Sequence, residues 1–272
     1  MPARIEFHQN QAMAQVTLSY PKRFNAMSRA MWRELRSIFE SIQRSTDVRC
    51  VLISGHGAHF CAGGDISEYT SFRFAEPSLR EFHEVDVWGA LSAMLACDVP
   101  IVAQISGNCM GAGVEIASCC DIRLAGESAQ FGAPIARLGF PMAPREAALV
   151  GRELGLTTAR QMLLEAAVFS APEMLQRGFL SRVVADVDLV TLAHSTVQRI
   201  ATLAPRAARL NKQTLRALNQ SEALMNKGYE AIDLKVTDGP LSQLMASAYA
   251  YADSAEQREG ITAFLEKRPA VF

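Results

Sequence analysis

Three short apolar runs with helical patterns around them restrict the folds open to this chain of 272 residues. The runs cover residues 50–53, 101–105 and 122–124, and each has the length and composition of a strand buried on both faces. Apolar side chains between residues 31 and 42 share one face of a helix, and residues 80–97 are also helical in pattern. Strands that alternate with helices predict an α/β fold.

The two ends of the chain carry different patterns. Residues 5–8 and 15–18 predict an antiparallel pair of strands. No strong strand signal follows Asp188, and the breaks between the expected helices fall at Pro205, near Ser221, at Gly239-Pro240 and at Ser254. We therefore expect a core of residues 1–200 and a C-terminal helical region of residues 201–272.

The composition excludes several classes of protein. Hydrophobic residues make up 49% of the chain, which is enough for a large core, and the net charge is −1. The absence of a long Lys or Arg run argues against nucleic-acid and membrane-surface partners, and no stretch is long enough to span a membrane. A cytoplasmic location is the expectation. Cysteines without C-x-x-C spacing predict reduced, mostly buried thiols: Cys50, Cys61, Cys97, Cys109, Cys119 and Cys120.

Two segments between the expected elements have no clear periodicity. Residues 67–77 contain two phenylalanines and a proline, and we predict a loop there. His56, His59 and Cys61 have a spacing that resembles a metal site. No fourth ligand follows at a recognisable spacing, and glycines surround the histidines as in an exposed turn, so we expect no metal.

The segment from Asn108 to Glu115 follows an apolar strand and contains Gly111 and Gly113. If these glycines begin a helix, the free N–H groups of its first turn and the carboxylate of Glu115 lie together. Fixed N–H donors beside a proton-transfer group suit chemistry at a carbonyl compound. The alternative is a tight turn that serves packing alone. The glycine order does not fit a dinucleotide site, and no P-loop lysine follows.

Several segments, in this order, resemble those of one family. They are residues 21–27 (PKRFNAM), 60–66 (FCAGGDI), 107–115 (GNCMGAGVE), 120–125 (CDIRLA), 130–134 (QFGAP) and the closing stretch 254–272. The chain resembles the enoyl-CoA hydratase/isomerase family, the crotonases, over nearly its whole length.

The resemblance implies an α/β fold made of a spiral of ββα turns, followed by a C-terminal helical region. It also implies a homotrimer or a hexamer of two trimers, an acyl-CoA thioester as substrate, a role in fatty acid metabolism and no permanently bound cofactor. The backbone amides of Ala62 and Ala112 would form an oxyanion hole, with Glu115 as the acid/base residue. Residues implied to contact the coenzyme A portion are Arg23, Phe24, Gly64, Asp65, Ile66, Phe264 and Lys267. For Lys267 the alternative is an ordinary charge at a helix end.

One position departs from the family pattern. Hydratases that resemble this chain carry a second glutamate where Ile135 follows Pro134. A positioned acid or base contributes about 100- to 10,000-fold in rate, so ordinary hydration should be severely slowed.

Three interpretations of this departure remain open. Glu115 acts alone, as in an isomerase or decarboxylase without two glutamates, with a pKa raised by apolar neighbours. Alternatively another acid substitutes; Glu146 is the candidate, although its position also suits a simple helix N-terminal charge, and His83 is expected at the surface. In the third, the chain is a non-catalytic acyl-CoA-binding subunit.

Overall fold

The computed structural model of the chain describes residues 2–220, 248–252 and 254–272. The helix breaks expected near Ser221 and at Gly239-Pro240 lie outside these residues. The boundary expected at residue 200 between core and helical region stays a prediction.

The main sheet has six strands in the order β1-β2-β3-β4-β6-β9. The first two strands form the expected antiparallel pair, and every later neighbour pairs in parallel. The strands are β1 (Arg4–Asn10), β2 (Met13–Ser19), β3 (Cys50–Gly55), β4 (Ile101–Ile105), β6 (Ile122–Gly126) and β9 (Arg182–Val184). The apolar runs at 50–53, 101–105 and 122–124 thus form adjacent central strands.

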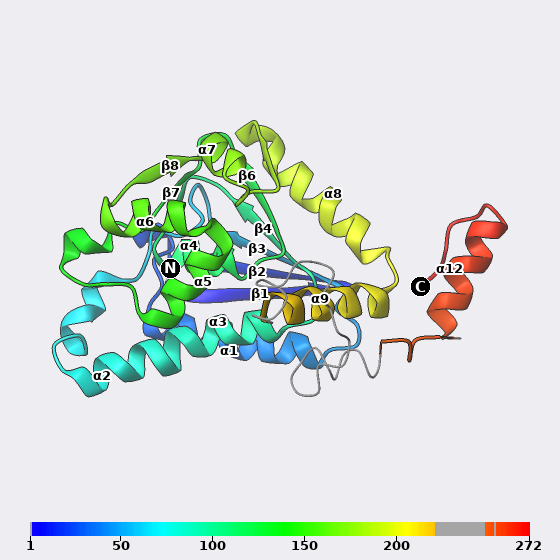
Figure 1. Cartoon of the computed structure of the whole chain (residues 1–272), viewed down its shortest axis with the longest axis horizontal. Helices are drawn as coiled ribbons and strands as arrows, with labels where there is room; N and C mark the ends of the chain where they lie inside the picture. The colour runs from blue at the N-terminus through cyan, green and yellow to red at the C-terminus, as the bar shows by residue number, and fades with distance from the viewer. Residues whose placement is uncertain (1, 221–247, 253) are drawn as a thin grey trace, which may run out of the picture.

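Helices cover both faces of this sheet, which explains why its central strands are apolar throughout. Val51 and Ile53 belong to the main core, which also contains residues of α1 (Arg29–Arg44) and α3 (Trp88–Ala96). Cys50 and Leu52 point the other way and pack with α8 (Leu189–Ala201). Figure 1 shows α1 and α3 on one side of the sheet and α8 on the other.

A second, three-stranded sheet lies beside the first, and no sequence pattern predicts it. Its order is β5 (Asn108–Met110), β7 (Gln130–Gly132) and β8 (Val168–Ser170). Each strand has only three residues, which is too short for an alternating pattern. A parallel bridge between Cys61 and Cys109 connects the segment after β3 to β5. The two sheets therefore meet where the glycine-rich segments lie.

The segment expected as a loop at residues 67–77 is mostly helical, so that prediction is wrong. A 3₁₀ helix spans Ile66–Ser71, and α2 (Glu76–Glu81) follows with Pro77 in its first turn, where a missing N–H costs nothing. A π-helical turn, Phe82–Val87, then leads into α3. Side-chain contacts, which a test of periodicity does not detect, order this segment: Phe72 and Phe82 are buried with their ring centroids 4.4 Å apart.

Short helices complete the layer around the second sheet. They are α4 (Ala112–Ser118), α5 (Pro144–Leu154), α6 (Leu156–Leu164) and α7 (Ala171–Gln176). A capping box of Ser170 and Glu173 begins α7. Near the C-terminus lie α9 (Pro205–Gln220) and α12 (Ala255–Leu265), whose N-cap is Ser254.

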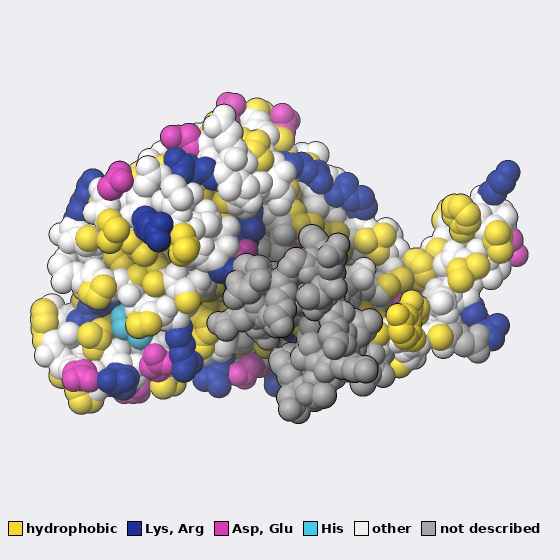
Figure 2. Space-filling model, in the orientation of Figure 1, with side chains coloured by type: hydrophobic (Ala, Val, Ile, Leu, Met, Phe, Trp, Pro, Cys, Tyr) yellow, Lys and Arg dark blue, Asp and Glu magenta, His cyan; other side chains and the backbone are white. Residues whose placement is uncertain are grey.

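Helix α12 projects from the body of the molecule at the right of Figure 1. Figure 2 shows hydrophobic side chains on this projection, and Ile261, Phe264 and Leu265 are 56%, 82% and 73% exposed. The backbone oxygen of Phe272 accepts a hydrogen bond of 2.7 Å from Arg49, so the last residue contacts the residue that precedes β3. No helix among the described residues is long and apolar enough to cross a membrane.

Candidate active site

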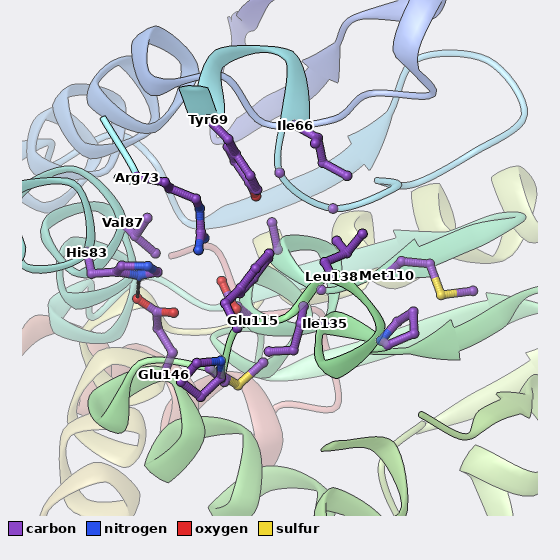
Figure 3. Close-up of a pocket in the computed structure, with 18 of the residues that line it drawn as sticks. Ile66, Tyr69, Arg73, His83, Val87, Met110, Glu115, Ile135, Leu138 and Glu146 are labelled. Carbon is purple, nitrogen blue, oxygen red and sulfur yellow. Dashed lines mark hydrogen bonds and ion pairs between the residues drawn. The ribbon is translucent and has the colours of Figure 1, made fainter. Parts of the chain in front are cut away.

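A pocket of about 330 Å³ lies where the two sheets meet (Figure 3). Ala62 and Gly64 come to it from the segment after β3, and Ala112 and Glu115 come from α4. The other walls are formed by the helical segment 66–87, residues 134–142 and the start of α5. The structure therefore brings together the three residues expected to act on the thioester, together with Gly64 and Ile66 from the implied coenzyme A set.

The turn from β5 into α4 needs its glycines. Gly111 has φ +47°, in the region that favours glycine, and a Cβ atom on Gly113 would lie 2.8 Å from the Cys61 carbonyl oxygen. Ala112 is the first helical residue, so its N–H has no acceptor within α4. The Glu115 N–H closes the first turn by donating to the Gly111 oxygen at 3.0 Å. Close packing and a free N–H thus occur together at this turn.

The second expected donor is already occupied. The Ala62 N–H donates to the Phe24 carbonyl oxygen at 3.0 Å, and Phe24 has a left-handed backbone with φ +50°. Ala62 lines the pocket, so its place fits the expectation. Its N–H is available to a ligand only if the bond to Phe24 is shared or broken.

Glu115 lies in the pocket wall with 7% of its surface exposed. Burial raises its pKa well above the usual value, the charge of Glu146 raises it further, and Arg73 opposes them. The protonated form is therefore favoured over a wider pH range than in a free glutamate. A carboxyl group with a raised pKa can give a proton and take it back in the course of a reaction.

His83 and Glu146 form a hydrogen-bonded pair in the same pocket, which corrects two expectations. His83 Nδ1 lies 2.8 Å from Glu146 Oε1, and their side chains are 16% and 4% exposed (dashed line in Figure 3). His83 is thus not a surface residue, and Glu146 is more than a charge at the start of α5. The π-helical turn at Phe82–Val87 carries His83, and such turns are frequent at functional sites. Only the three-dimensional packing of α5 against this turn reveals the pair.

Ile135 lies in the pocket wall, at the start of a short 3₁₀ helix. This segment contributes other apolar side chains to the pocket, including Leu138 and Met142. The described residues around the pocket include two carboxyl groups, Glu115 and Glu146, and neither comes from the segment of Ile135.

Arg73 was not singled out by the sequence analysis. Its guanidinium lies over the rings of Tyr69 and Phe140, 4.1 Å and 3.8 Å from their centroids. The Tyr69 hydroxyl lies so close to Gly64 that a Cβ atom there would clash with it, which explains a glycine at this position. Arg73 and Tyr69 form the pocket wall that faces Glu115 in Figure 3.

The other residues implied to contact coenzyme A form two groups. One group lies around the pocket, and the other lies far from it. Arg23 and Phe24 are exposed, and the Phe24 ring packs edge-on against His59, with the ring centroids 4.8 Å apart. Asp65 is buried and caps the 3₁₀ helix at residue 66 by accepting from the Ser67 N–H at 3.1 Å.

Two implied contacts are not made within a single chain. Phe264 and Lys267 lie on α12 or directly after it, far from the pocket (Figure 1). Neither residue lines the pocket.

The histidine-cysteine spacing has a structural explanation. His59 Nδ1 accepts a hydrogen bond of 3.1 Å from the Asn108 N–H, which ties the segment after β3 to β5. No cluster of ligands suited to a metal occurs in the described part of the chain. All six cysteines are buried and free, as expected.

Comparison with known proteins identifies the family to which this chain belongs. A model of the enoyl-CoA hydratase/isomerase family matches residues 8–272. The chain belongs to the enoyl-CoA hydratase/isomerase family. "Probable enoyl-CoA hydratase echA8" of Mycobacterium tuberculosis is 30% identical over 265 residues, covering 97% of this chain and 95% of that protein. The short-chain-enoyl-CoA hydratase of Clostridium acetobutylicum is 29% identical, with coverages of 94% and 92%.

Solved structures of this family have the same fold. The crystal structure of an enoyl-CoA hydratase/carnithine racemase from Magnetospirillum magneticum has a TM-score of 0.87 and 33% identity, and covers 100% of this chain and 96% of its own. The α/β crotonase fold expected from the sequence is thereby confirmed.

Proposed function

We propose that this family member is an enzyme that acts on an acyl-CoA thioester through an enolate. The observation that supports this most directly is the position of Glu115, buried one turn after the free N–H of Ala112. A thioester oxygen that accepts from Ala112 gains negative charge when the α-proton leaves, and fixed N–H donors stabilise that charge. Glu115 takes the proton and returns it.

The second oxyanion donor is proposed to be the Ala62 N–H. It donates to the Phe24 carbonyl, so a thioester oxygen must share this N–H or displace the carbonyl. Phe24 and Asn25 both have positive φ, so the carbonyl that competes for the Ala62 N–H belongs to a short left-handed turn.

The His83–Glu146 pair is the candidate for a second proton-transfer group. Hydration adds a hydroxyl and a proton to two carbons, and Ile135 supplies no acid for this purpose. His83 Nε2 has no hydrogen bond within the described residues, while Nδ1 is held by Glu146. We propose that Glu115 acts alone, in isomerisation or decarboxylation, with hydration in which this pair replaces the missing acid as the alternative. A non-catalytic acyl-CoA-binding subunit remains the other class of function, although such a subunit has no chemical need for Glu115.

Coenzyme A contacts and assembly follow from the family and are also proposals. Arg23, Phe24, Gly64, Asp65 and Ile66 would contact the coenzyme A portion of the substrate, which takes the place of a separate cofactor. The exposed apolar side chains of α12 suit packing against another copy, so a homotrimer or hexamer is proposed in which Phe264 and Lys267 close a neighbour's site. We propose the cytoplasm as its location and fatty acid metabolism as its setting.

The test is hydrogen exchange at the α-carbon. Saturated acyl-CoA thioesters are incubated with the protein in deuterated water, and exchange is measured by mass spectrometry. The wild type should introduce deuterium, whereas Glu115→Gln should lose about 100-fold or more in rate and still bind the thioester. Glu165→Gln, an exposed substitution of the same kind, serves as the control. Equal exchange by wild type and Glu115→Gln contradicts the role of Glu115.

A further inference from the structure

A cation lies in the mostly apolar wall of the pocket. Arg73 is only partly exposed and is stacked on Tyr69 and Phe140, at 4.1 Å and 3.8 Å from the ring centroids. Stacking of this kind fixes the plane of a guanidinium and leaves its in-plane N–H donors available for hydrogen bonds. In Figure 3 the guanidinium points into the pocket, on the side of Glu115.

The charge of Arg73 has no carboxylate partner among the described residues. Its Nε is buried without a hydrogen-bond acceptor, and the group that its side chain hydrogen-bonds is the neutral hydroxyl of Tyr69. Of the two carboxyl groups in the pocket, Glu146 is held by His83. Glu115 forms no ion pair with Arg73, and its burial favours the neutral form. The pocket therefore contains an arginine whose donors face the space that the acyl group would occupy.

Physical chemistry restricts the ligand that fits this arrangement. A cation in apolar surroundings is unfavourable unless an anion or several acceptors accompany it. A guanidinium binds a carboxylate through two parallel N–H···O bonds, which suits its planar shape. A purely hydrocarbon acyl chain would leave Arg73 without an anionic partner and would exclude water from it.

We propose that the preferred acyl group ends in a carboxylate, which Arg73 binds. The ligand is then a CoA monothioester of a short dicarboxylic acid. This inference rests on the proposed function, since the thioester end must lie at Ala112 for the acyl chain to extend toward Arg73.

The proposal also restricts the reaction. An ion pair with Arg73 stabilises the carboxylate of the bound substrate and is lost when carbon dioxide leaves. Arg73 therefore favours isomerisation or hydration of a substrate that keeps its carboxylate, and it disfavours decarboxylation of that group.

The test compares affinities by calorimetry. Glutaryl-CoA and adipyl-CoA are titrated into the full-length protein. Pentanoyl-CoA and hexanoyl-CoA, whose acyl groups are uncharged and which are called the neutral thioesters below, are titrated in parallel. The wild type should bind the carboxylated thioesters about 10- to 100-fold more tightly, as expected for a hydrogen bond to a charged group. Arg73→Gln should lose this preference and bind the neutral thioesters as before or better, while Arg73→Lys should keep part of it.

Arg137→Gln is the matched control, because Arg137 also lines the pocket but lies exposed at its edge. It should change the affinity for both classes of thioester by the same factor. Equal binding of the two classes by the wild type, or a preference that survives in Arg73→Gln, overturns the proposal and leaves the proposed function intact. Failure of every thioester to bind overturns both. If Arg73→Gln does not fold, Arg73→Met takes its place. An undiminished preference for glutaryl-CoA in Arg73→Met decides against the assignment. Complete loss of that preference in Arg73→Met, with part of it kept in Arg73→Lys, supports the assignment.

Discussion

Burial raises the pKa of Glu115, and the charge of Glu146 raises it further, because the two carboxyl groups line one pocket from two different helices. Glu115 lies in α4 and Glu146 in α5, and His83 holds Glu146 in place at 2.8 Å. The proton affinity of the proposed catalytic residue thus depends on a second acid that is 31 positions away in the sequence.

The first prediction concerns the pH dependence of turnover. Glu146→Gln removes one of the charges that raise the pKa of Glu115, so that pKa should fall. The limb of the pH-rate profile that reports Glu115 should move to lower pH. The rate of deuterium exchange at the α-carbon of a saturated thioester, measured over a pH series, checks this prediction. Glu165→Gln is the control. An unmoved limb would show that Glu146 does not act on Glu115.

The second prediction concerns the missing acid. Wild-type protein should hydrate crotonyl-CoA slowly, and Ile135→Glu should hydrate it faster, by up to the roughly 100- to 10,000-fold that a positioned acid or base supplies. Ile135→Gln has a similar shape without the acid and should gain nothing. Loss of the enoyl absorbance measures the rate. Robust hydration by the wild type would contradict the interpretation of Ile135 as a defect and favour the His83–Glu146 pair as its replacement.

The third prediction concerns the close approach of Gly64 and Tyr69. A Cβ atom at Gly64 would clash with the Tyr69 hydroxyl, and the nearest ring carbon would lie at 3.2 Å. Gly64→Ala should therefore destabilise the protein by about 1–3 kcal/mol and weaken thioester binding. Tyr69→Phe removes the clashing atom and should recover part of the loss in the double variant. Strictly additive effects in urea unfolding would rule out this contact.

The fourth prediction concerns Asp98, which joins α9 to the core. Burial raises its pKa, but hydrogen bonds from Gln43, Gln213 and Arg216, at 2.9, 2.7 and 2.7 Å, lower it more, and the net pKa is below the usual value. A depressed pKa contributes stability above the unfolded value of about 3.9, and that stability is lost as the pH falls through the folded value. Asp98→Asn should cost about 1.5–3 kcal/mol at neutral pH.

The cost of Asp98→Asn should shrink in acid, because the wild-type carboxyl is then protonated too. Urea unfolding at neutral pH and at a pH below the folded pKa measures the difference. Asp47→Asn, at an exposed position, should be nearly neutral at both pH values. A cost that stays constant with pH would contradict the proposed charge dependence.

Sequence patterns predicted the main sheet well, because its strands are long enough and apolar enough to be recognised. The runs predicted at residues 50–53 and 101–105 lie in β3 and β4, and Gly111 lies in the turn that precedes α4. The second sheet was missed because three-residue strands such as β5 carry no period. The 3₁₀ helix at Ile66–Ser71 is also too short to show a periodic pattern, so a loop is predicted there.

The site was predicted unevenly, for a physical reason. Glu115 and Ala112 are neighbours in the sequence, so a local motif places them together. His83 and Glu146 are brought together by the packing of two helical segments that are distant in the sequence. Arg73 is recognised as a binding residue only because it stacks on the rings of Tyr69 and Phe140. The Ala62 N–H bond to Phe24 depends on a left-handed turn that no spacing reveals.

The bridge between Cys61 and Cys109, where the sheets meet beside the pocket, makes these thiols reporters of local opening. Both side chains are fully buried, and burial raises the pKa of Cys61 to about 12 and that of Cys109 well above its usual value. Because the thiolate is the reactive form, a labelling reagent can modify them only after the two sheets separate there. The rate of labelling, with and without a thioester, therefore measures how firmly a ligand holds the two halves of the site together.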